Sequence, residues 1–171
     1  MCARGVRDMN RRPAGLLLAV IVFLADQATK YWVLHGSGLT DGHFLVLLPV
    51  LNFVLVWNHG VTFGLLGGLG GFGWVLLAAI AVAVVIALGV WLWRSDHLLK
   101  SLAIGAIMGG AAGNVLDRLR YGAVVDFIQA HIGVYSFYVF NVGDSAIVCG
   151  VGVLMFESLL RRDAGGDRKA A

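Results

Sequence analysis

The sequence contains little charge. Asp, Glu, Lys and Arg make up only 13% of its 171 residues, whereas 59% are hydrophobic, and the mean hydropathy is +0.84. A soluble domain of this length needs more polar surface than this composition supplies. The composition therefore excludes an ordinary soluble fold and indicates an integral membrane protein.

The sequence also lacks the motifs of disulfide frameworks, zinc peptidases and serine hydrolases. Its two cysteines, Cys2 and Cys149, lie far apart without a CxxC motif, so neither a disulfide nor a metal site follows from them. No HExxH motif is present, and the histidines are scattered. They include His35, His43, His59 and His131. GxSxG is absent as well, which leaves a nucleophilic Ser145 as a weak alternative.

A basic stripe of the kind that binds nucleic acid is absent, although the pI is about 9.1. The Lys and Arg residues instead cluster next to apolar runs, in residues 1–12, 94–100 and 161–171. Such clusters are typical of the cytoplasmic segments of membrane proteins. We therefore predict that these three segments and both termini face the cytoplasm, and that nucleic acid is not a partner.

Four apolar runs are long enough to cross a membrane as helices, which predicts an all-α membrane protein with one domain. The clearest run has 22 uncharged residues, about 33 Å of helix at 1.5 Å per residue. The first run could pass for a signal peptide, but it is long and contains Asp26 and Lys30, so we expect it to be retained. The predicted spans are residues 13–34, 72–93, 98–118 and 138–160.

Two further patterns concern packing and the segment between the first two spans. Glycines recur every fourth residue at Gly105, Gly109 and Gly113, which predicts a smooth face where another helix can approach closely. The apolar run 44–57 is interrupted by Pro49 and is rich in β-branched and aromatic residues. It predicts a small sheet on the outer membrane surface or a re-entrant element, with a spanning helix less favoured.

One stretch, residues 109–144, concentrates polar groups that the apolar runs otherwise exclude. Each charge costs roughly 2.5 to 3.5 kcal/mol at mid-bilayer, so such an accumulation indicates a use. With both termini inside, this stretch and the end of the first span meet near the outer surface. Its polar residues are Asn114, Asp117, Arg118, Asp126, Asn141 and Asp144. We therefore place the candidate active site here.

The charges on that side do not balance. Four carboxylates face only two cations, Lys30 and Arg118, with Arg120 expected to reach water. If Asp26 and Asp117 are the paired acids, Asp126 and Asp144 remain as a dyad. Two carboxylates about 4 Å apart repel by roughly 4 kcal/mol at an effective dielectric near 20, or about 3 pKa units. One member should therefore hold a proton, and such a dyad can activate water and protonate a leaving amine.

Other roles remain open for the flanking residues. Asp26 and Lys30 of the first span lie at i and i+4 and can form an ion pair with each other, which favours a structural role for both. Asp117 and Arg118 either pair at the end of a helix or contact substrate. Asn114 and Asn141 either satisfy backbone groups or hold a substrate peptide by its carbonyls.

Two other classes of protein compete with a peptidase. Intramembrane carboxylates also serve as proton relays in transporters and channels, but here the polar groups crowd one side and no inverted repeat is visible. A non-enzymatic assembly factor held together by its glycine face would give Asp126 and Asp144 no reason to stay unpaired.

Five blocks of sequence, in this order, resemble the lipoprotein signal peptidase family, the type II signal peptidases of bacteria. The resemblance covers about residues 14–160. The blocks are DQATK at Asp26–Lys30, NHGVTFG at Asn58–Gly64, GGAAGNVLDR at Gly109–Arg118, VDF at Val125–Phe127 and FNVGD at Phe140–Asp144.

The resemblance implies an aspartyl endopeptidase, without metal or cofactor, in the bacterial cytoplasmic membrane. It would cut prolipoproteins just before a diacylglyceryl-modified cysteine, near the outer face and among membrane lipid, and we expect a monomer. Asp126 and Asp144 would be catalytic. Residues that would bind the substrate or support the site are Asn58, Gly60, Asn114, Asp117, Arg118, Asn141, Asp26 and Lys30. The family's surface sheet and periplasmic helix would fall in residues 40–70 and 127–138. One departure is Gly143, where the family usually has alanine.

Overall fold

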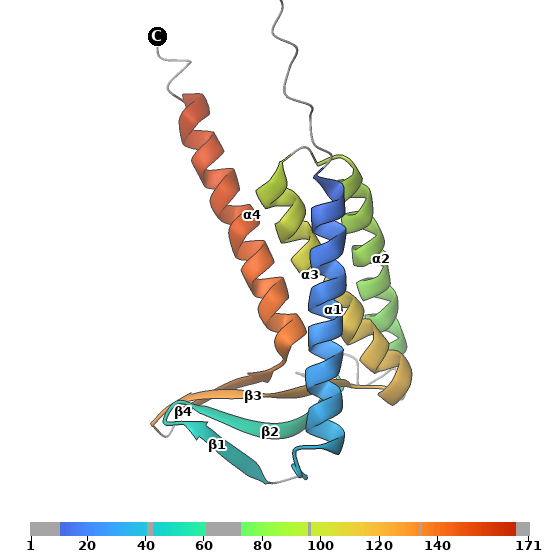
Figure 1. The fold of residues 1–171 in the computed structure, drawn as a ribbon, viewed down its shortest axis with the longest axis vertical. Helices are drawn as coiled ribbons and strands as arrows, with labels where there is room; N and C mark the ends of the chain where they lie inside the picture. Colours follow the sequence, from blue (N-terminus) through green and yellow to red (C-terminus); the bar gives the residue numbers. More distant parts are fainter. Residues whose placement is uncertain (1–10, 41–42, 61–72, 96, 134, 167–171) are drawn as a thin grey trace, which may run out of the picture.

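Four long helices and a four-stranded sheet make up the structure, a computed structural model that describes residues 11–40, 43–60, 73–95, 97–133 and 135–166 (Figure 1). All four helices are long and apolar enough to cross a membrane. The helices are α1 (Arg12–His35), α2 (Gly73–Trp93), α3 (Leu98–Tyr121) and α4 (Val142–Gly166). The strands are β1 (Phe44–Leu48), β2 (Leu51–Asn58), β3 (Val124–Ile132) and β4 (Tyr135–Phe140). The predicted fold class, four spanning helices with a small β element, is confirmed.

Helix α3 is the centre of the bundle, since it packs against α1, α2 and α4. The predicted glycine face is the reason that α1 can approach it. A Cβ atom on Gly105 or Gly109 would overlap main-chain carbonyl groups of α1, and one on Gly113 would overlap the carboxylate of Asp26. Small residues on α3 therefore allow the backbones of α1 and α3 to lie in contact.

The sheet lies across one end of the bundle, with the strands in the order β1-β2-β3-β4 and every neighbouring pair antiparallel (Figure 1). Strands β2 and β3 pair although α2 and α3 separate them in the sequence, and Val56 lies opposite Asp126. Phe127 of β3 is buried and meets the ring of Phe53 of β2 edge-on, with 5.6 Å between the ring centroids. The sheet thus carries Asp126 to the end of α3.

The structure differs from the sequence prediction most clearly between residues 127 and 141. The helix expected at 127–138 is wrong, because this segment is an antiparallel hairpin, β3 and β4, whose turn contains Gly133 at φ 58°. Consequently α4 begins at Val142 and not near residue 138. The aromatic and β-branched residues before it pair with β3 instead of extending the helix. Of the predicted surface element at 40–70, residues 44–58 form β1 and β2, and 61–70 lie outside the described residues.

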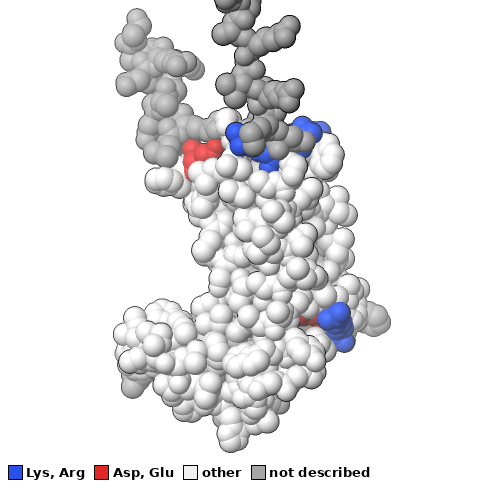
Figure 2. Space-filling model, viewed as in Figure 1, with Lys and Arg blue, Asp and Glu red and all other residues white. Residues whose placement is uncertain are grey.

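Charged side chains on the face drawn in Figure 2 lie at two levels, with an uncharged band between them. At one level Arg12 lies over the ring of Trp93 at 5.5 Å. Lys100 lies over the ring of Trp91 at 4.9 Å at the same end of the bundle. Aromatic and basic residues at the ends of apolar helices are typical of membrane interfaces. The chain is therefore a multi-pass membrane protein.

Candidate active site

The polar residues singled out in the sequence converge where the helices meet the sheet. Asp126 lies in β3, and Asp144 lies in the first turn of α4. The residues around them come from α1, β2, α3 and the segment before α4. They are Asp26, Lys30, Asn58, Gly60, Asn114, Asp117, Arg118 and Asn141.

Asp126 is buried, with 1% of its surface exposed, and both of its oxygens accept hydrogen bonds from asparagine amides. Asn141 Nδ2 donates to Oδ1 at 2.7 Å, and Asn58 Nδ2 donates to Oδ2 at 2.8 Å. Burial raises the pKa of Asp126 to about 6, and the negative charge of Asp144 acts in the same direction, whereas the two hydrogen bonds lower it. Asp126 therefore holds its proton up to a pH of about 6, well above the range of an ordinary aspartate.

Asp144 is fixed by a reciprocal cap at the start of α4. The Asp144 N–H donates to Asn141 Oδ1 at 2.8 Å, and the Asn141 N–H donates to Asp144 Oδ2 at 3.2 Å. This is the arrangement of a capping box, in which residues three apart satisfy each other's main-chain groups. Asp144 also lies in the first turn of α4, where a carboxylate interacts favourably with the helix dipole.

Asn114 connects the two aspartates to Lys30. Its Oδ1 accepts from Lys30 Nζ at 3.0 Å and from Asn141 Nδ2 at 3.1 Å, while its Nδ2 donates to Asp144 Oδ1 at 2.8 Å. The sequence left two roles open for Asn114 and Asn141: satisfying backbone groups, or holding a substrate peptide. In the structure both amides instead bind aspartate side chains, and Asn141 also accepts the main-chain N–H of Asp144.

Lys30 pairs with two acids at once. Its Nζ lies 2.7 Å from Asp26 Oδ2, as the i, i+4 spacing predicts, and also 2.7 Å from Asp117 Oδ2. Arg118 is consequently not needed to neutralise Asp117. Among the described residues Arg118 forms no ion pair; its Nη1 donates to the carbonyl of Asn114 at 3.3 Å, and its Nε is buried without a partner. Arg118 thus has hydrogen-bonding capacity left for a substrate.

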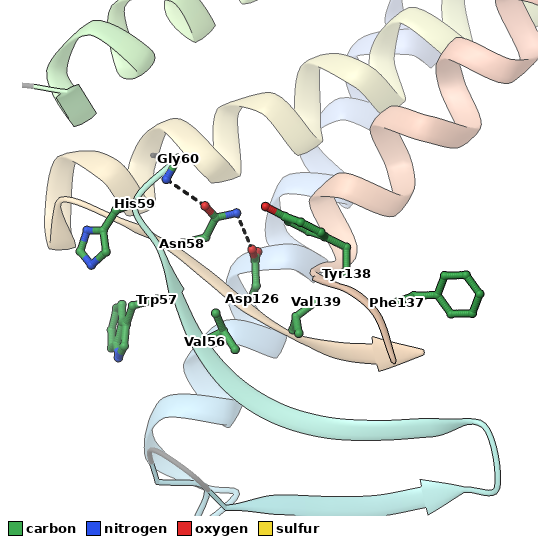
Figure 3. Close-up of a pocket in the computed structure, with 9 residues that line it drawn as sticks. All are labelled: Val56, Trp57, Asn58, His59, Gly60, Asp126, Phe137, Tyr138 and Val139. Atoms are coloured by element: carbon green, nitrogen blue, oxygen red, sulfur yellow. Dashed lines mark hydrogen bonds between the residues drawn. The ribbon is translucent and has the colours of Figure 1, made fainter. Parts of the chain in front are cut away.

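A cavity of about 620 Å³ opens beside Asp126 (Figure 3). Gly60, at φ 71°, donates its N–H to Asn58 Oδ1 at 2.9 Å, and this contact turns the Asn58 amide toward Asp126. The ring of Tyr138 lies beside this pair, whereas Phe137 points away (Figure 3). The cavity is lined by Val56, Trp57, Asn58, His59, Gly60, Asp126, Phe137, Tyr138 and Val139. Its largely apolar wall could accept an apolar peptide segment.

Sequence reasoning gave no role to Gln27 or Tyr138. Gln27 Nε2 donates to Asp117 Oδ1 at 3.0 Å and contacts Asp26 Oδ2 at 3.3 Å, so it joins α1 to α3 beside Lys30. In the sequence, its position next to Asp26 was the signal that could have marked Gln27 as part of the site. No motif marked Tyr138, since a single aromatic residue in a strand carries no chemical signature.

The arrangement can perform hydrolysis. Within the described residues neither Asp126 nor Asp144 forms an ion pair, and no group of three His, Cys, Asp or Glu residues is arranged to hold a metal ion. Asp126 lies beside the cavity and its pKa is raised in part by the charge of Asp144. Two carboxylates that interact in this way can share a proton and activate water.

Comparison with known proteins gives a consistent result. The profile of the signal peptidase (SPase) II family matches residues 18–160. A lipoprotein signal peptidase of Methylorubrum extorquens (strain PA1) is 46% identical over 146 residues, 85% of each chain. One from Rhodopseudomonas palustris (strain ATCC BAA-98 / CGA009) is 42% identical over 150 residues, 85% of this chain and 92% of the relative. A solved structure of a bacterial membrane enzyme superposes with a TM-score of 0.76 at 31% identity, covering 86% of this chain and 93% of the other.

Proposed function

The chain belongs to the signal peptidase II family, aspartic peptidases that remove signal peptides from lipoproteins, and we propose that Asp126 and Asp144 are the dyad that performs this cleavage. The observation that supports this assignment most strongly is the division of the four carboxylates. Asp26 and Asp117 both form ion pairs with Lys30, whereas Asp126 and Asp144 are held by asparagine amides.

Asp144 is the base in the proposed reaction, and Asp126 is the acid. Asp144, ionised at the start of α4, takes a proton from water as the water oxygen bonds to the peptide carbonyl carbon. Asp126 gives its proton to the carbonyl oxygen, which yields a neutral tetrahedral diol. The carbon–nitrogen bond then breaks as the amine takes the proton held by Asp144, and Asp126 recovers its proton from the second hydroxyl. Water is consumed and both carboxyl groups return to their starting forms.

The proposed substrate is a prolipoprotein whose cysteine carries a diacylglyceryl group, cut just before that cysteine. The lipid would hold the scissile bond near the membrane surface, where the dyad lies at the junction of helices and sheet. Arg118, Asn58 and Gly60 would contact the peptide, since Arg118 Nε has no partner among the described residues and the other two line the cavity.

The test is cleavage of a diacylglyceryl-modified prolipoprotein by the purified protein in detergent, followed by gel shift. We expect cleavage by the wild type, and a loss of at least about 1,000-fold in kcat for both Asp126→Asn and Asp144→Asn, because each removes one half of the proton transfer. Full activity in either variant would show that the dyad is assigned wrongly.

A second substrate, identical but with an unmodified cysteine, tests lipid-dependent positioning in the same assay. We expect much slower cleavage, and equal rates would refute the lipid's role. Absence of cleavage by folded wild type would favour the transporter alternative, which a proton-flux assay in vesicles would then examine.

A further inference from the structure

Each catalytic aspartate is preceded by a residue whose main-chain N–H is anchored to a buried carboxylate. The Val125 N–H, just before Asp126, donates to Asp117 Oδ2 at 3.1 Å. The Gly143 N–H, just before Asp144, donates to Asp26 Oδ1 at 2.8 Å. The two anchors therefore have the same form, although one holds a strand and the other a helix start.

Lys30 joins these two anchors into one unit. Its Nζ lies 2.7 Å from both Asp26 Oδ2 and Asp117 Oδ2, and all three side chains are at most 3% exposed. The three residues lie on α1 and α3, which pack closely along the glycine face. A rigid helix pair thus holds the backbone on which each catalytic residue is mounted.

Lys30 also sets the direction of the hydrogen bonds around the dyad. An ammonium group can only donate, so its contact with Asn114 requires the amide oxygen on that side. The amide nitrogen of Asn114 must then point at Asp144, as observed. The same oxygen accepts from Asn141 Nδ2, which also donates to Asp126.

From these contacts, and on the basis of the proposed dyad, we propose that Lys30, Asp26 and Asp117 form a positioning clamp that fixes the spacing of Asp126 and Asp144. The clamp residues do not touch the reacting atoms. They act through the Val125 and Gly143 N–H groups and through the Asn114 amide. Buried ion pairs by themselves add little net stability, so a positional role explains why three charges are buried here.

The two clamp carboxylates use their oxygens differently, and this difference permits a matched test. Asp117 accepts from Lys30 and from Val125 with one oxygen, Oδ2. Asp26 accepts from Lys30 with Oδ2 but from Gly143 with Oδ1. An asparagine side chain has one acceptor oxygen. Asp117→Asn can therefore keep both contacts, whereas Asp26→Asn must lose one of them.

Gln27 can turn its amide oxygen toward the new NH₂ group of Asp117→Asn. This turn gives up its longer contacts with Asp26 Oδ2 at 3.3 Å and Gly113 O at 3.4 Å. Both substitutions are isosteric, both are buried, and both remove one of the two negative charges beside Lys30. A role limited to charge balance or to filling space predicts equal losses for the two variants.

The experiment measures kcat, KM and the melting temperature of both variants in detergent, with the diacylglyceryl-modified prolipoprotein as substrate. We expect kcat of Asp26→Asn to fall about 100-fold with KM within about threefold of wild type, as a misplacement of about 1 Å would produce. We expect kcat of Asp117→Asn to lie at least about fivefold above that of Asp26→Asn.

A smaller ratio between the two variants, or a loss expressed in KM, would overturn the clamp while leaving the dyad assignment intact. If Asp26→Asn does not fold, Asp117→Asn decides alone: a fall in kcat of less than about twentyfold supports the clamp, and a larger fall overturns it. Failure of the folded wild type to cleave would instead contradict the proposed function, and the clamp with it.

Discussion

Asp126 is almost completely buried and accepts two hydrogen bonds from amides. Burial and these hydrogen bonds shift its pKa in opposite directions. Burial raises its pKa, whereas the donors Asn58 and Asn141 stabilise the charged form. The balance, a pKa of about 6, lies where an acid catalyst can both hold and release a proton. The asparagines thus keep Asp126 from becoming too weak an acid to work.

The first prediction concerns pH. Because Asp126 must be protonated in the free enzyme, kcat/KM should fall as pH rises above about 6, approaching a tenfold loss for each further pH unit. The apparent value belongs to the pair of aspartates. A pH profile of kcat/KM between about 5 and 8.5, on the lipid-modified substrate, measures it.

Asn58→Leu provides the control for that profile. It removes the hydrogen bond that lowers the pKa of Asp126 and fills the same space with apolar atoms, so the alkaline limb should move to higher pH. A limb that stays in place, or that moves to lower pH, would show that Asp126 is not the group that titrates.

At the scale of elements, the start of α4 is held against α3 by close contact between two glycines. A Cβ atom on Gly110 would overlap the main-chain carbonyl of Gly143. A Cβ on Gly143 would meet Gly110 O at 3.0 Å and Asp26 Oδ1 at 3.1 Å, which is tight but possible after small shifts. The alanine usual in the family at this position can therefore be accommodated, and glycine here leaves the Asp26 contact unhindered.

The second prediction is that Gly110→Ala displaces α4 and Asp144 with it. Overpacking of this kind typically lowers the free energy of unfolding by about 1 to 3 kcal/mol, so the melting temperature should fall by several degrees. The kcat should fall roughly 10- to 100-fold, since the two aspartates lie on different elements. Thermal melting and steady-state kinetics in detergent measure both effects.

Gly152→Ala is the matched control within the same helix pair. No heavy atom lies within 4 Å of a Cβ atom at Gly152, so this change should stabilise α4 by about 0.5 to 1 kcal/mol and leave kcat unaltered. Wild-type kcat and melting temperature in Gly110→Ala would mean that the glycine contact does not hold α4 in place.

Hydropathy was enough to predict the four helices, because membrane spans need long apolar runs. Charge balance was enough to separate Asp26 and Asp117, which pair with Lys30, from Asp126 and Asp144, which form no ion pair among the described residues. The capping pair Asn141 and Asp144 has the sequence signal of a helix start, a capping residue and an acid three apart before an apolar run. The predicted span at 138–160 missed this signal, because it placed both residues inside the helix. The β3–β4 hairpin was not readable from the sequence, since aromatic and β-branched residues suit a strand and a membrane helix alike. Nor could the sequence show that Lys30 pairs with Asp117, because that contact depends on how α1 packs on α3.

At the scale of the whole molecule, the two ends of the bundle differ in their exposed aromatic and basic side chains. The end with the sheet exposes Tyr31, Tyr135 and Tyr138, each at least 67% exposed, together with the apolar strand β1. Aromatic side chains at this level are typical of a membrane surface. The opposite end carries Arg12, Arg94 and Lys100.

The third prediction follows from this asymmetry: the basic end faces the cytoplasm, and the sheet with the dyad faces outward. It is tested with single cysteines in a protein whose Cys2 and Cys149 are replaced by serine. Ser136→Cys lies on exposed β4, and His97→Cys lies on the exposed turn before α3. A membrane-impermeant maleimide added to intact spheroplasts should label Ser136→Cys and should label His97→Cys only after lysis, because the positive-inside rule places the basic turn in the cytoplasm. The reverse labelling pattern would put the dyad on the cytoplasmic side, away from lipoprotein precursors whose acyl chains lie in the outer leaflet. That result would contradict both the orientation and the substrate proposed for this site.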